Sequence, residues 1–493
     1  MKPDRYAGAT PQRASLMSFI AIALALSLYR VGVIIHLGLD PYVDEAYYWG
    51  WAQSLDWGYY SKPPMIAALI AGSIQLFGDH LLAIKAPSLI LYPATAVVIR
   101  QLGCTLFDSR VGFWSGLAFL TMPLTATLGL FVSTDAPLLF FWALGMLLLW
   151  RTLQQGTVKQ WVGIGVVCGL GLMSKYTMLA FVGSAFLVLL ADADGRRQLT
   201  RPGPWIGALV ALAMLAPNLM WNWQHDFPTI RHTAEITRIG VGGRGLNLDE
   251  FVEFAGAQWI SFGPLLMAGL LWAFIRPQPG WVEPRFRFLL LFSLPLLVIV
   301  SLQALTGRAN GNWSAPVYVS ASVLVLAFLA QRARWKLAII AVALNAVLGI
   351  AVYHWPDIVQ LAGKTLNGRN DPYKRARGWN ELVGQVRPQL AAHPDAVLVG
   401  DDRELLAQLI YGLRPSRYAR WQADPHIIDH YGLTVPLSTT SGDTVLFVSI
   451  RPDIGDTGTC FESVEKIADV DVAVYQNFHR RVSIWLLKGF KGY

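Results

Sequence analysis

Charged residues are scarce in this chain. They make up 15% of its 493 residues, whereas a soluble domain of this size carries about 25%. Cysteine is scarcer still: the three cysteines, Cys104, Cys168 and Cys460, lie far apart, which argues against a disulfide framework and against a cysteine metal site. The sequence also has no internal repeat and no low-complexity tract. These absences exclude an ordinary soluble domain and a disulfide-rich module.

Long apolar runs are what the chain has in abundance. Hydrophobic residues make up 54% of the sequence, and the mean hydropathy is +0.42. Runs of roughly 18–24 apolar residues recur from Ser15 to His354, which is the pattern of a polytopic membrane protein. The first run is too long for a signal-peptide core and is followed by no small-residue cleavage site, so we expect a retained anchor. The predicted spans are 15–37, 81–100, 111–131, 136–150, 160–173, 176–191, 203–221, 257–275, 288–305, 313–330 and 337–354.

The basic residues decide the predicted topology. The net charge of +8 comes largely from short loops such as those of Arg196, Arg197, Arg332 and Arg334, and it therefore indicates membrane topology rather than a nucleic-acid partner. Segment 63–77 is short and is opened by prolines. If it does not cross the membrane, most basic loops fall on one side. We expect about eleven spans with the N-terminus inside, and 63–77 as an interfacial or re-entrant helix.

The composition changes at about Trp355, after the last predicted span. The alternating and helical patterns that follow predict a small α/β domain. Its predicted elements are helices at 380–390 and 404–411 and strands at 396–399, 444–450, 470–475 and 481–487. We therefore expect an α-helical polytopic membrane domain at 1–355, with interfacial helices in its first outer loop at 38–80, and an outer α/β domain at 356–493.

The first outer loop holds an acidic pair, Asp44 and Glu45, within a cluster of aromatic residues. The aromatic residues are Tyr47, Tyr48, Trp49, Tyr59 and Tyr60. A carboxylate can deprotonate a hydroxyl, and aromatic rings stack on sugar faces. The alternative is a helix N-terminus, with Asp44 as cap and Glu45 favoured by the helix dipole. Because consecutive helical residues point about 100° apart, we expect the two carboxylates to have different roles.

Four basic residues lie at the outer ends of predicted spans or in outer turns: Arg30, Lys62, Lys85 and Lys175. Cations embedded in a membrane are costly and are functional candidates by default. An anion at headgroup depth, such as a lipid phosphate, is their expected common partner. For Lys62, which precedes Pro63, the alternative is a lysine that snorkels to the interface.

Further outer-face candidates are polar residues next to spans. Asp135 is either a helix cap followed by a proline in the first turn or a second catalytic carboxylate. The others are Asn222, His225, Arg308 and Asn312, which we expect to contact the acceptor or the donor. The tryptophans beside Asn222 are also ordinary for a membrane interface. No second histidine stands at ligand spacing from His225, so the sequence supports no metal site and no cofactor.

These motifs, in this order, resemble bacterial GT-C glycosyltransferases. The motifs are the acidic pair, Tyr60-Ser61-Lys62-Pro63-Pro64, Ser133-Thr134-Asp135-Ala136-Pro137 and Leu172-Met173-Ser174-Lys175-Tyr176. Over 15–355 the chain is similar to the protein mannosyltransferase and aminoarabinose transferase group (families 39 and 83), which includes rhizobial galacturonosyltransferases acting on lipopolysaccharide. The resemblance implies about 11 to 13 transmembrane helices.

The resemblance also implies a function: inverting transfer of a sugar from a polyprenyl-phosphate donor at the periplasmic face of the bacterial inner membrane. Asp44 matches the catalytic aspartate, Lys62 the lysine near the donor phosphate, and Lys85 a basic residue early in the next span. In the aminoarabinose transferases the residue before the lysine that Lys62 matches is often a glutamate, which is associated with a metal. In this chain that residue is Ser61. Expected partners are the lipid-linked donor, membrane lipids and an acceptor such as lipid A, lipopolysaccharide or another envelope glycan.

Two other functions fit a multi-span protein with polar residues at one face. One is a flippase or transporter of a lipid-linked sugar, although transporters commonly show two related halves with midplane sites, which this sequence lacks. The other is an O-antigen ligase or polymerase, against which the early acidic pair argues. The sequence names neither the sugar nor the acceptor.

Overall fold

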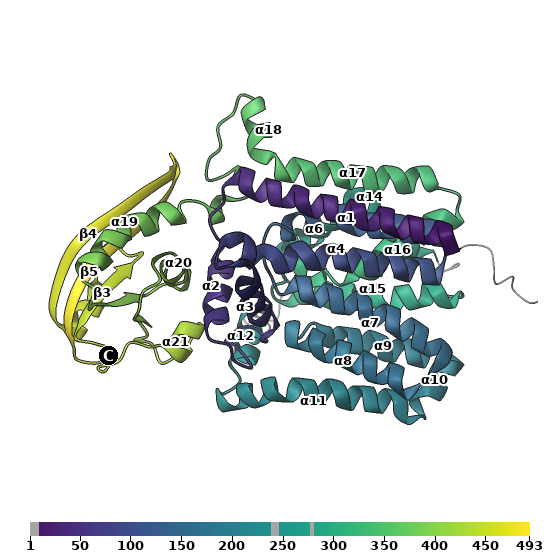
Figure 1. The fold of residues 1–493 in the computed structure, drawn as a ribbon, viewed down its shortest axis with the longest axis horizontal. Coiled ribbons are helices and arrows are strands. Elements are labelled where there is room, and N and C mark those ends of the chain that lie inside the picture. Colours follow the sequence, from purple (N-terminus) through teal and green to yellow (C-terminus); the bar gives the residue numbers. More distant parts are fainter. Residues whose placement is uncertain (1–8, 238–245, 277–280) are drawn as a thin grey trace, which may run out of the picture. The chain divides into compact units, whose positions relative to one another are not determined.

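The computed structural model describes residues 9–237, 246–276 and 281–493 (Figure 1). The chain forms two compact units. The first, the helical unit, consists of Met1–Val33, Lys62–Ile66 and Lys85–Tyr353. The second, the sheet unit, consists of Ile34–Ser61, Ala67–Ile84 and His354–Tyr493. Most of the first outer loop thus belongs to the same compact unit as the C-terminal region.

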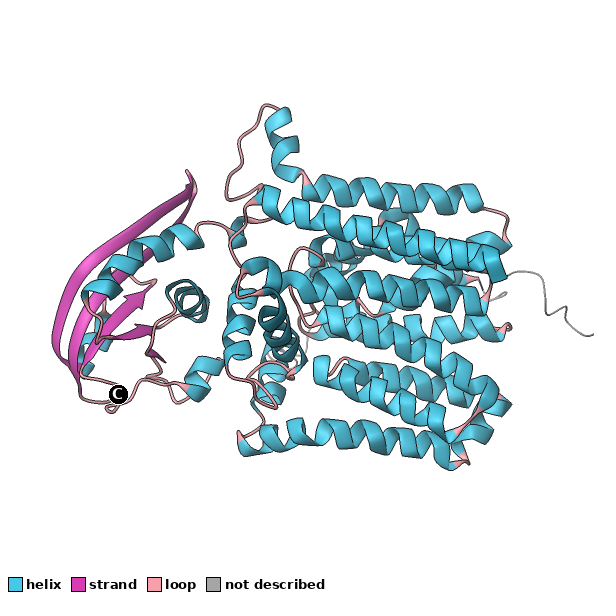
Figure 2. Cartoon of the chain, viewed as in Figure 1, coloured by secondary structure: helices cyan, strands magenta, loops and turns pink. Residues whose placement is uncertain are grey.

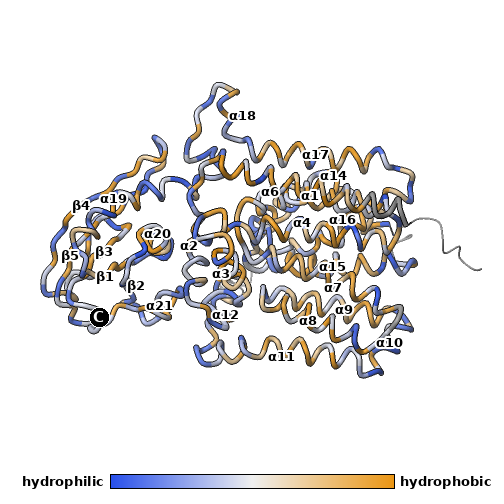
Figure 3. The backbone as a smooth tube through the Cα atoms, viewed as in Figure 1, coloured by the Kyte–Doolittle hydropathy of each residue, from blue (hydrophilic) through white to orange (hydrophobic). Residues whose placement is uncertain are grey.

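The helical unit is built from apolar helices that pack on one another (Figures 1 and 3). Helix α11 packs along α8, α8 along α7, and α15 along α16. Helix α16 is buried along most of its length, as expected for a helix that is apolar all round. The helices are α1 (Ala9–Leu37), α4 (Leu81–Leu106), α5 (Ser109–Thr121), α6 (Pro123–Leu128), α7 (Asp135–Gln155), α8 (Val158–Ser174), α9 (Met178–Ala191), α10 (Ala193–Leu199), α11 (Pro202–Gln224), α12 (Pro228–Thr237), α13 (Leu248–Phe262), α14 (Pro264–Ile275), α15 (Pro284–Thr306), η1 (Gly311–Ser314), α16 (Val317–Gln331) and α17 (Trp335–Tyr353).

The predicted multi-pass membrane architecture is confirmed. Within the described ranges, six helices are long and apolar enough to cross a membrane, and eight if each of two sharply bent pairs counts as one span. This number is below the predicted eleven because several predicted segments form shorter helices. Helices Val158–Ser174 and Val317–Gln331 have 17 and 15 residues, and a helix rises about 1.5 Å per residue against a hydrocarbon core of about 30 Å.

Two predicted spans are broken. Segment 111–131 divides into α5 and α6 at Pro123. Segment 257–275 divides into α13 and α14, which are bent by 110°. At this second break Gly263 has a φ of +90°, and Asn345 donates a hydrogen bond from Nδ2 to the Phe262 carbonyl at 2.9 Å. A Cβ at position 263 would lie 1.7 Å from Asn345 Oδ1, so only glycine fits there.

The sheet unit contains a five-stranded sheet flanked by helices (Figure 2). The strand order is β2-β1-β3-β5-β4, with β1 parallel to β2 and β3, and β5 antiparallel to β3 and β4. The strands are β1 (Val397–Gly400), β2 (Tyr418–Arg420), β3 (Thr444–Ser449), β4 (Phe461–Tyr475) and β5 (Phe478–Phe490). The other elements are α2 (Val43–Gln53), α3 (Met65–Phe77), α18 (Trp355–Leu361), η2 (Lys374–Ala376), α19 (Trp379–Ala392), α20 (Arg403–Leu413), α21 (His430–Thr434) and η3 (Gly455–Cys460).

Alternating side chains of β1 enter two different cores. Leu398 packs with residues of α19 and α20, whereas Val397 and Val399 pack on the other face with Trp421 and Phe447. This alternation is the two-residue period of a strand. The predicted small α/β domain is therefore confirmed, and each predicted helix and strand matches an observed element, with Ala396 and Ile450 just outside β1 and β3. The sequence did not reveal β2 or the full length of β4.

Candidate functional site

The acidic pair lies in the first turn of α2, and its two carboxylates have different surroundings. The Glu45 side chain is buried and accepts a hydrogen bond from the Tyr42 backbone N–H at 2.9 Å, as an N3 residue does in a capping box. The Asp44 side chain is 42% exposed and accepts from Arg403 at 3.1 Å. Thus Glu45 holds the helix start, and Asp44 is presented at the surface of the sheet unit.

Arg403 is the charged partner of Asp44. Burial lowers the pKa of the Arg403 guanidinium, but Asp44, Tyr47 and Glu404 together outweigh burial and raise that pKa above its ordinary value. Arg403 also lies over the Tyr47 ring at 5.1 Å. The pair is half exposed, with Arg403 34% exposed. Such a pair is worth at most about 1 kcal/mol and exchanges readily with other partners.

The five aromatic candidates of the first outer loop, Tyr47, Tyr48, Trp49, Tyr59 and Tyr60, are packed inside the sheet unit. Their rings are buried, and their polar atoms are bound: Tyr47 Oη accepts from the His430 N–H at 2.5 Å, and Tyr60 Oη donates to the Ile427 carbonyl at 2.9 Å. Trp49 Nε1 donates to Asp79 at 2.9 Å. Tyr59 stacks on Trp51 at 4.5 Å, and burial raises the pKa of Tyr59 to about 12. Tyr48 is buried as well. A sugar-binding role for these rings stays a prediction.

Three predicted site residues meet in the helical unit. Lys175 Nζ donates to Asp135 Oδ1 at 2.7 Å, and Asn312 Nδ2 donates to Asp135 Oδ2 at 2.8 Å. Asp135 is 3% exposed and Lys175 16% exposed. Thr134, rather than Asp135, stands at the N-cap position of α7. The Asp135 carboxylate therefore holds Lys175 and Asn312 in place, and we call these three residues the Asp135 cluster.

The Asp135 cluster is built from three helix ends. Asp135 opens α7, Lys175 is the C-cap residue of α8, and Asn312 lies in η1 before α16. Next to Lys175, Tyr176 Oη donates to Asn218 Oδ1 at 2.5 Å and accepts from Asn222 Nδ2 at 3.2 Å. The buried Asn222 thus contacts Tyr176, the residue that follows Lys175 of the Asp135 cluster.

Arg30 is buried beside the break between α5 and α6, and Lys85 is buried beside the chain just after α6. Arg30 donates to the Leu120 carbonyl at 3.0 Å and to Tyr353 Oη at 2.7 Å, and Lys85 donates to the Leu130 carbonyl at 3.0 Å. These carbonyls lie at helix ends, where the backbone loses its own partners. Both cations therefore supply hydrogen bonds that a broken span needs inside a membrane.

The remaining candidates lie apart from these clusters. His225 Nδ1 is 2.8 Å from the Trp221 carbonyl, and its ring stacks on Trp221 at 4.3 Å. The Arg308 side chain is exposed, and its backbone N–H donates to the Thr237 carbonyl. Lys62 is half-buried at the start of the segment before α3. The segment between the predicted spans 203–221 and 257–275 lies partly outside the described residues, at 238–245.

One group in the described part of the chain has the spacing of metal ligands, and sequence reasoning missed it. His36, His354 and Asp357 place their ligand atoms within 4.8 Å of one another. Both imidazoles contact Asp357, at 3.1 Å for His36 and 2.9 Å for His354. Because the two histidines stand 318 positions apart in the sequence, no local motif marks them.

Comparisons with known proteins agree with this fold. Residues 61–221 match the family model described as dolichyl-phosphate-mannose-protein mannosyltransferase. The lipid A galacturonosyltransferase RgtD of Rhizobium johnstonii is 31% identical over 83% of this chain and 85% of its own length. An undecaprenyl phosphate-alpha-4-amino-4-deoxy-L-arabinose arabinosyl transferase of Pseudomonas fluorescens is 29% identical over 32% of this chain and 30% of its own length.

Solved structures show the same fold at low identity. The structure of ArnT from Cupriavidus metallidurans bound to undecaprenyl phosphate matches 97% of this chain and 98% of that chain, with a TM-score of 0.63 and 16% identity. The archaeal oligosaccharyltransferase AglB from Archaeoglobus fulgidus matches 90% of this chain and 70% of that chain, with a TM-score of 0.53 and 14% identity.

The similarity to RgtD over 83% of this chain confirms the predicted enzyme class and the predicted resemblance to GT-C glycosyltransferases. The chain belongs to the glycosyltransferase family that contains the lipid A galacturonosyltransferase RgtD.

Proposed function

We propose that this protein transfers a monosaccharide from a polyprenyl-phosphate donor to lipid A or another lipopolysaccharide acceptor, with inversion at the anomeric carbon. The observation that carries this proposal is the 31% identity to a lipid A galacturonosyltransferase across 83% of the chain. In this proposal residues 1–355 form the catalytic membrane domain and 356–493 a periplasmic domain. The sugar itself is left open.

In the proposed reaction, Asp44 is the general base. It accepts the proton of an acceptor hydroxyl while that oxygen forms its bond to the anomeric carbon. The bond between the anomeric carbon and the phosphate oxygen breaks, and polyprenyl phosphate leaves with the electron pair. The exposed carboxylate and its weak pairing with Arg403 support this assignment, because a base must be free to exchange partners. The buried Glu45 supports the helix that carries it.

Lys175 and Lys62 are proposed to bind the donor phosphate and to stabilise the charge of the leaving group. An ammonium group has three N–H donors, and Asp135 accepts one from Lys175. The donors that remain suit a phosphate, and the carboxylate fixes the lysine in advance. Arg308, Lys85 and Arg30 are secondary candidates for the same anion. Asn222, His225 and Asn312 are proposed contacts of the sugar or the acceptor.

The proposed function makes a direct prediction about the leaving group. The purified protein, given a radiolabelled polyprenyl-phosphate sugar and lipid A, should release free polyprenyl phosphate in step with the appearance of labelled lipid A. A flippase would move the donor without cleaving it, so an intact donor after incubation with a competent acceptor would contradict the proposal. Lipopolysaccharide from cells with and without the gene, compared by mass spectrometry, would identify the sugar.

We further propose that the protein lies in the bacterial inner membrane with Asp44 and the C-terminal tail in the periplasm. The asymmetry of basic loops supports this orientation. An alkaline phosphatase fusion after Tyr493 should be active, and a fusion near Arg197 inactive. The reverse pattern would contradict the orientation and the assignment of Asp44.

A further inference from the structure

Two histidines and one aspartate to which the proposed function gives no role form a cluster with the composition of a metal site. His36 lies in the last turn of α1, His354 directly follows α17, and Asp357 lies in α18. All three belong to the sheet unit. Imidazole nitrogen and carboxylate oxygen are both ligands of Zn²⁺ in proteins. The fold thus brings together ligands from two segments that are 318 positions apart in the sequence.

The distances within this cluster fit one Zn²⁺ ion. Asp357 Oδ2 is 3.1 Å from His36 Nε2 and 2.9 Å from His354 Nδ1, and the three ligand atoms all lie within 4.8 Å of one another. Ligand atoms bound to a tetrahedral Zn²⁺ ion at about 2.0–2.1 Å lie about 3.3 Å apart. Small shifts of the two contacts to Asp357 and a rotation of one imidazole ring therefore suffice to place the three atoms around an ion.

The charges around Asp357 also favour a cation. Its carboxylate forms ion pairs with the two imidazoles and, within the described residues, with no lysine or arginine. An imidazole is not a permanent cation, and it binds a metal through a neutral nitrogen. Asp471 of the same unit differs, because it pairs with His479 at 2.6 Å and also with Arg481 at 2.9 Å. Asp471 thus has a permanent cation beside it, whereas a bound metal ion can supply the positive charge at Asp357.

The segments that carry the three ligands are fixed, while the ligands themselves stay open to solvent. At the end of α1 the Leu37 carbonyl accepts from Arg377 at 3.3 Å. At the start of α18 Trp355 Nε1 donates to the Asn370 carbonyl at 2.7 Å. The three ligand side chains are between 35% and 53% exposed. An ion can therefore enter from solvent and keep a water molecule as its fourth ligand.

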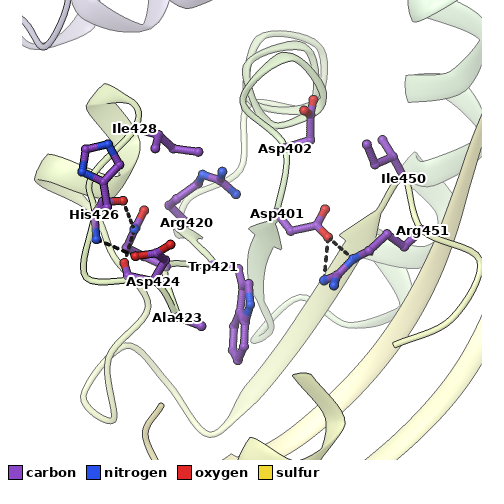
Figure 4. A pocket seen from close by; sticks show the side chains of 11 residues that line it. Asp401, Asp402, Arg420, Trp421, Ala423, Asp424, His426, Ile428, Ile450 and Arg451 are labelled. Carbon is purple, nitrogen blue, oxygen red and sulfur yellow. Dashed lines mark hydrogen bonds and ion pairs between the residues drawn. The ribbon is translucent and has the colours of Figure 1, made fainter. Parts of the chain in front are cut away.

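Proximity of histidine and aspartate does not by itself define such a site. A pocket of about 370 Å³ at the carboxyl ends of β1, β2 and β3 is lined by one histidine and three aspartates (Figure 4): His426, Asp401, Asp402 and Asp424. Two of these carboxylates are already bound, Asp401 by Arg451 at 2.9 Å and Asp424 by the His426 backbone N–H at 2.8 Å. Among the residues that the structure describes, the spacing of metal ligands is met at His36, His354 and Asp357 and not in this pocket.

We propose that one Zn²⁺ ion binds to His36 Nε2, His354 Nδ1 and the Asp357 carboxylate, with water as the fourth ligand. The ion joins the end of α1 to the chain between α17 and α18. It therefore stabilises the sheet unit, because a ligand that binds only the folded state adds its binding free energy to the stability of that state. This inference stands on the cluster alone and does not depend on the proposed function.

The test measures binding of Zn²⁺ alone by the full-length protein in detergent. The protein is stripped with a chelator, dialysed and titrated with Zn²⁺ by calorimetry, and the bound metal is counted by inductively coupled plasma mass spectrometry. We expect one tightly bound Zn²⁺ per native chain. His36→Gln and His354→Gln should each weaken this binding by about 10–100-fold or more, because loss of even an outer-shell partner of a metal site has an effect of that size.

The matched control is His479→Gln, which removes a partly exposed histidine that is paired with an aspartate in the same unit. It should bind Zn²⁺ as the native protein does. Excess Ca²⁺, which prefers oxygen ligands, should not displace the Zn²⁺ ion. If the native protein binds no stoichiometric Zn²⁺, the cluster is an ion-pair network only and the proposal is wrong. A tight site that persists in both His36→Gln and His354→Gln is an adventitious site elsewhere, which also overturns the proposal.

Thermal unfolding gives a second readout of the same site. Added Zn²⁺ should raise the melting temperature of the native and His479→Gln proteins and leave that of the His36→Gln protein unchanged. Because the His36 side chain is 53% exposed, we expect the variant to fold. An equal rise in all three proteins would contradict the assignment. If the native protein binds Zn²⁺ at this cluster but transfers no sugar, the metal site stands and the proposed function fails.

Discussion

Transfer by the Asp44→Asn variant is expected to be slower than native transfer by about 10²–10⁴-fold, the usual contribution of a general base. Donor affinity should change little, because the amide keeps the shape of the side chain and still accepts from Arg403. A fall in rate with intact ground-state binding is the mark of an interaction made in the transition state. The measurement is transfer rate and donor affinity on the same purified protein.

The matched control is Glu45→Gln at the neighbouring position. Glu45 is buried and bound to the Tyr42 N–H, and glutamine can accept the same hydrogen bond. We therefore expect this variant to keep most of its activity. If Asp44→Asn transfers at a near-normal rate and Glu45→Gln is inactive, the general base is Glu45 and not Asp44. Normal transfer by both variants would contradict a catalytic role for the acidic pair.

Lys175→Ala should destabilise the protein by about 3–5 kcal/mol, the cost of leaving a buried charge without its partner. Asp135 is 3% exposed, and its other oxygen is bound by the neutral Asn312. Truncation of the lysine therefore leaves a carboxylate with no cation bound to it within the described residues. The measurement is the free energy of unfolding in detergent, from a denaturant titration of purified protein.

The control for this prediction is the double variant Asp135→Asn/Lys175→Met. It removes both charges while keeping similar volumes, so most of the stability should return. Activity should not return, because the proposed phosphate ligand is missing. Full stability of the Lys175→Ala protein would contradict a structural role for the pair. Native transfer by the double variant would contradict its role in the reaction.

The sequence predicted the fold class well because its signals are local. Long apolar runs predict helices in a membrane, and short apolar runs predicted β1 and β3 to within one residue. The signals failed where a partner is distant. Lys175 stands 40 positions after Asp135, and no acid stands beside it in sequence, so the lysine was predicted to bind a phosphate alone. Arg403 is 359 positions from Asp44, and the local sequence at neither residue indicates that the two are in contact.

The broken spans were missed for a related reason. Hydropathy continues across Pro123 and across Gly263, so each segment was predicted as one helix. At the first break the Leu120 carbonyl accepts from Arg30, and just after α6 the Leu130 carbonyl accepts from Lys85; both cations lie on other helices. A hydropathy pattern contains no information on such hydrogen-bond partners. The need to bind these carbonyls explains why the two cations stand inside apolar segments.

Strand β4 bears on whether the sheet unit aggregates with other copies of the chain. It is an edge strand of 15 residues, long enough to offer many unpaired backbone groups to another chain. Its sequence includes Glu462, Glu465, Lys466, Asp469 and Asp471, and its pairing with β5 has two irregularities, at 466–468 and 473–475. Interspersed charge and bulges are how natural sheets prevent edge-to-edge aggregation. The long exposed edge of this sheet is thereby protected against pairing with a second copy of itself.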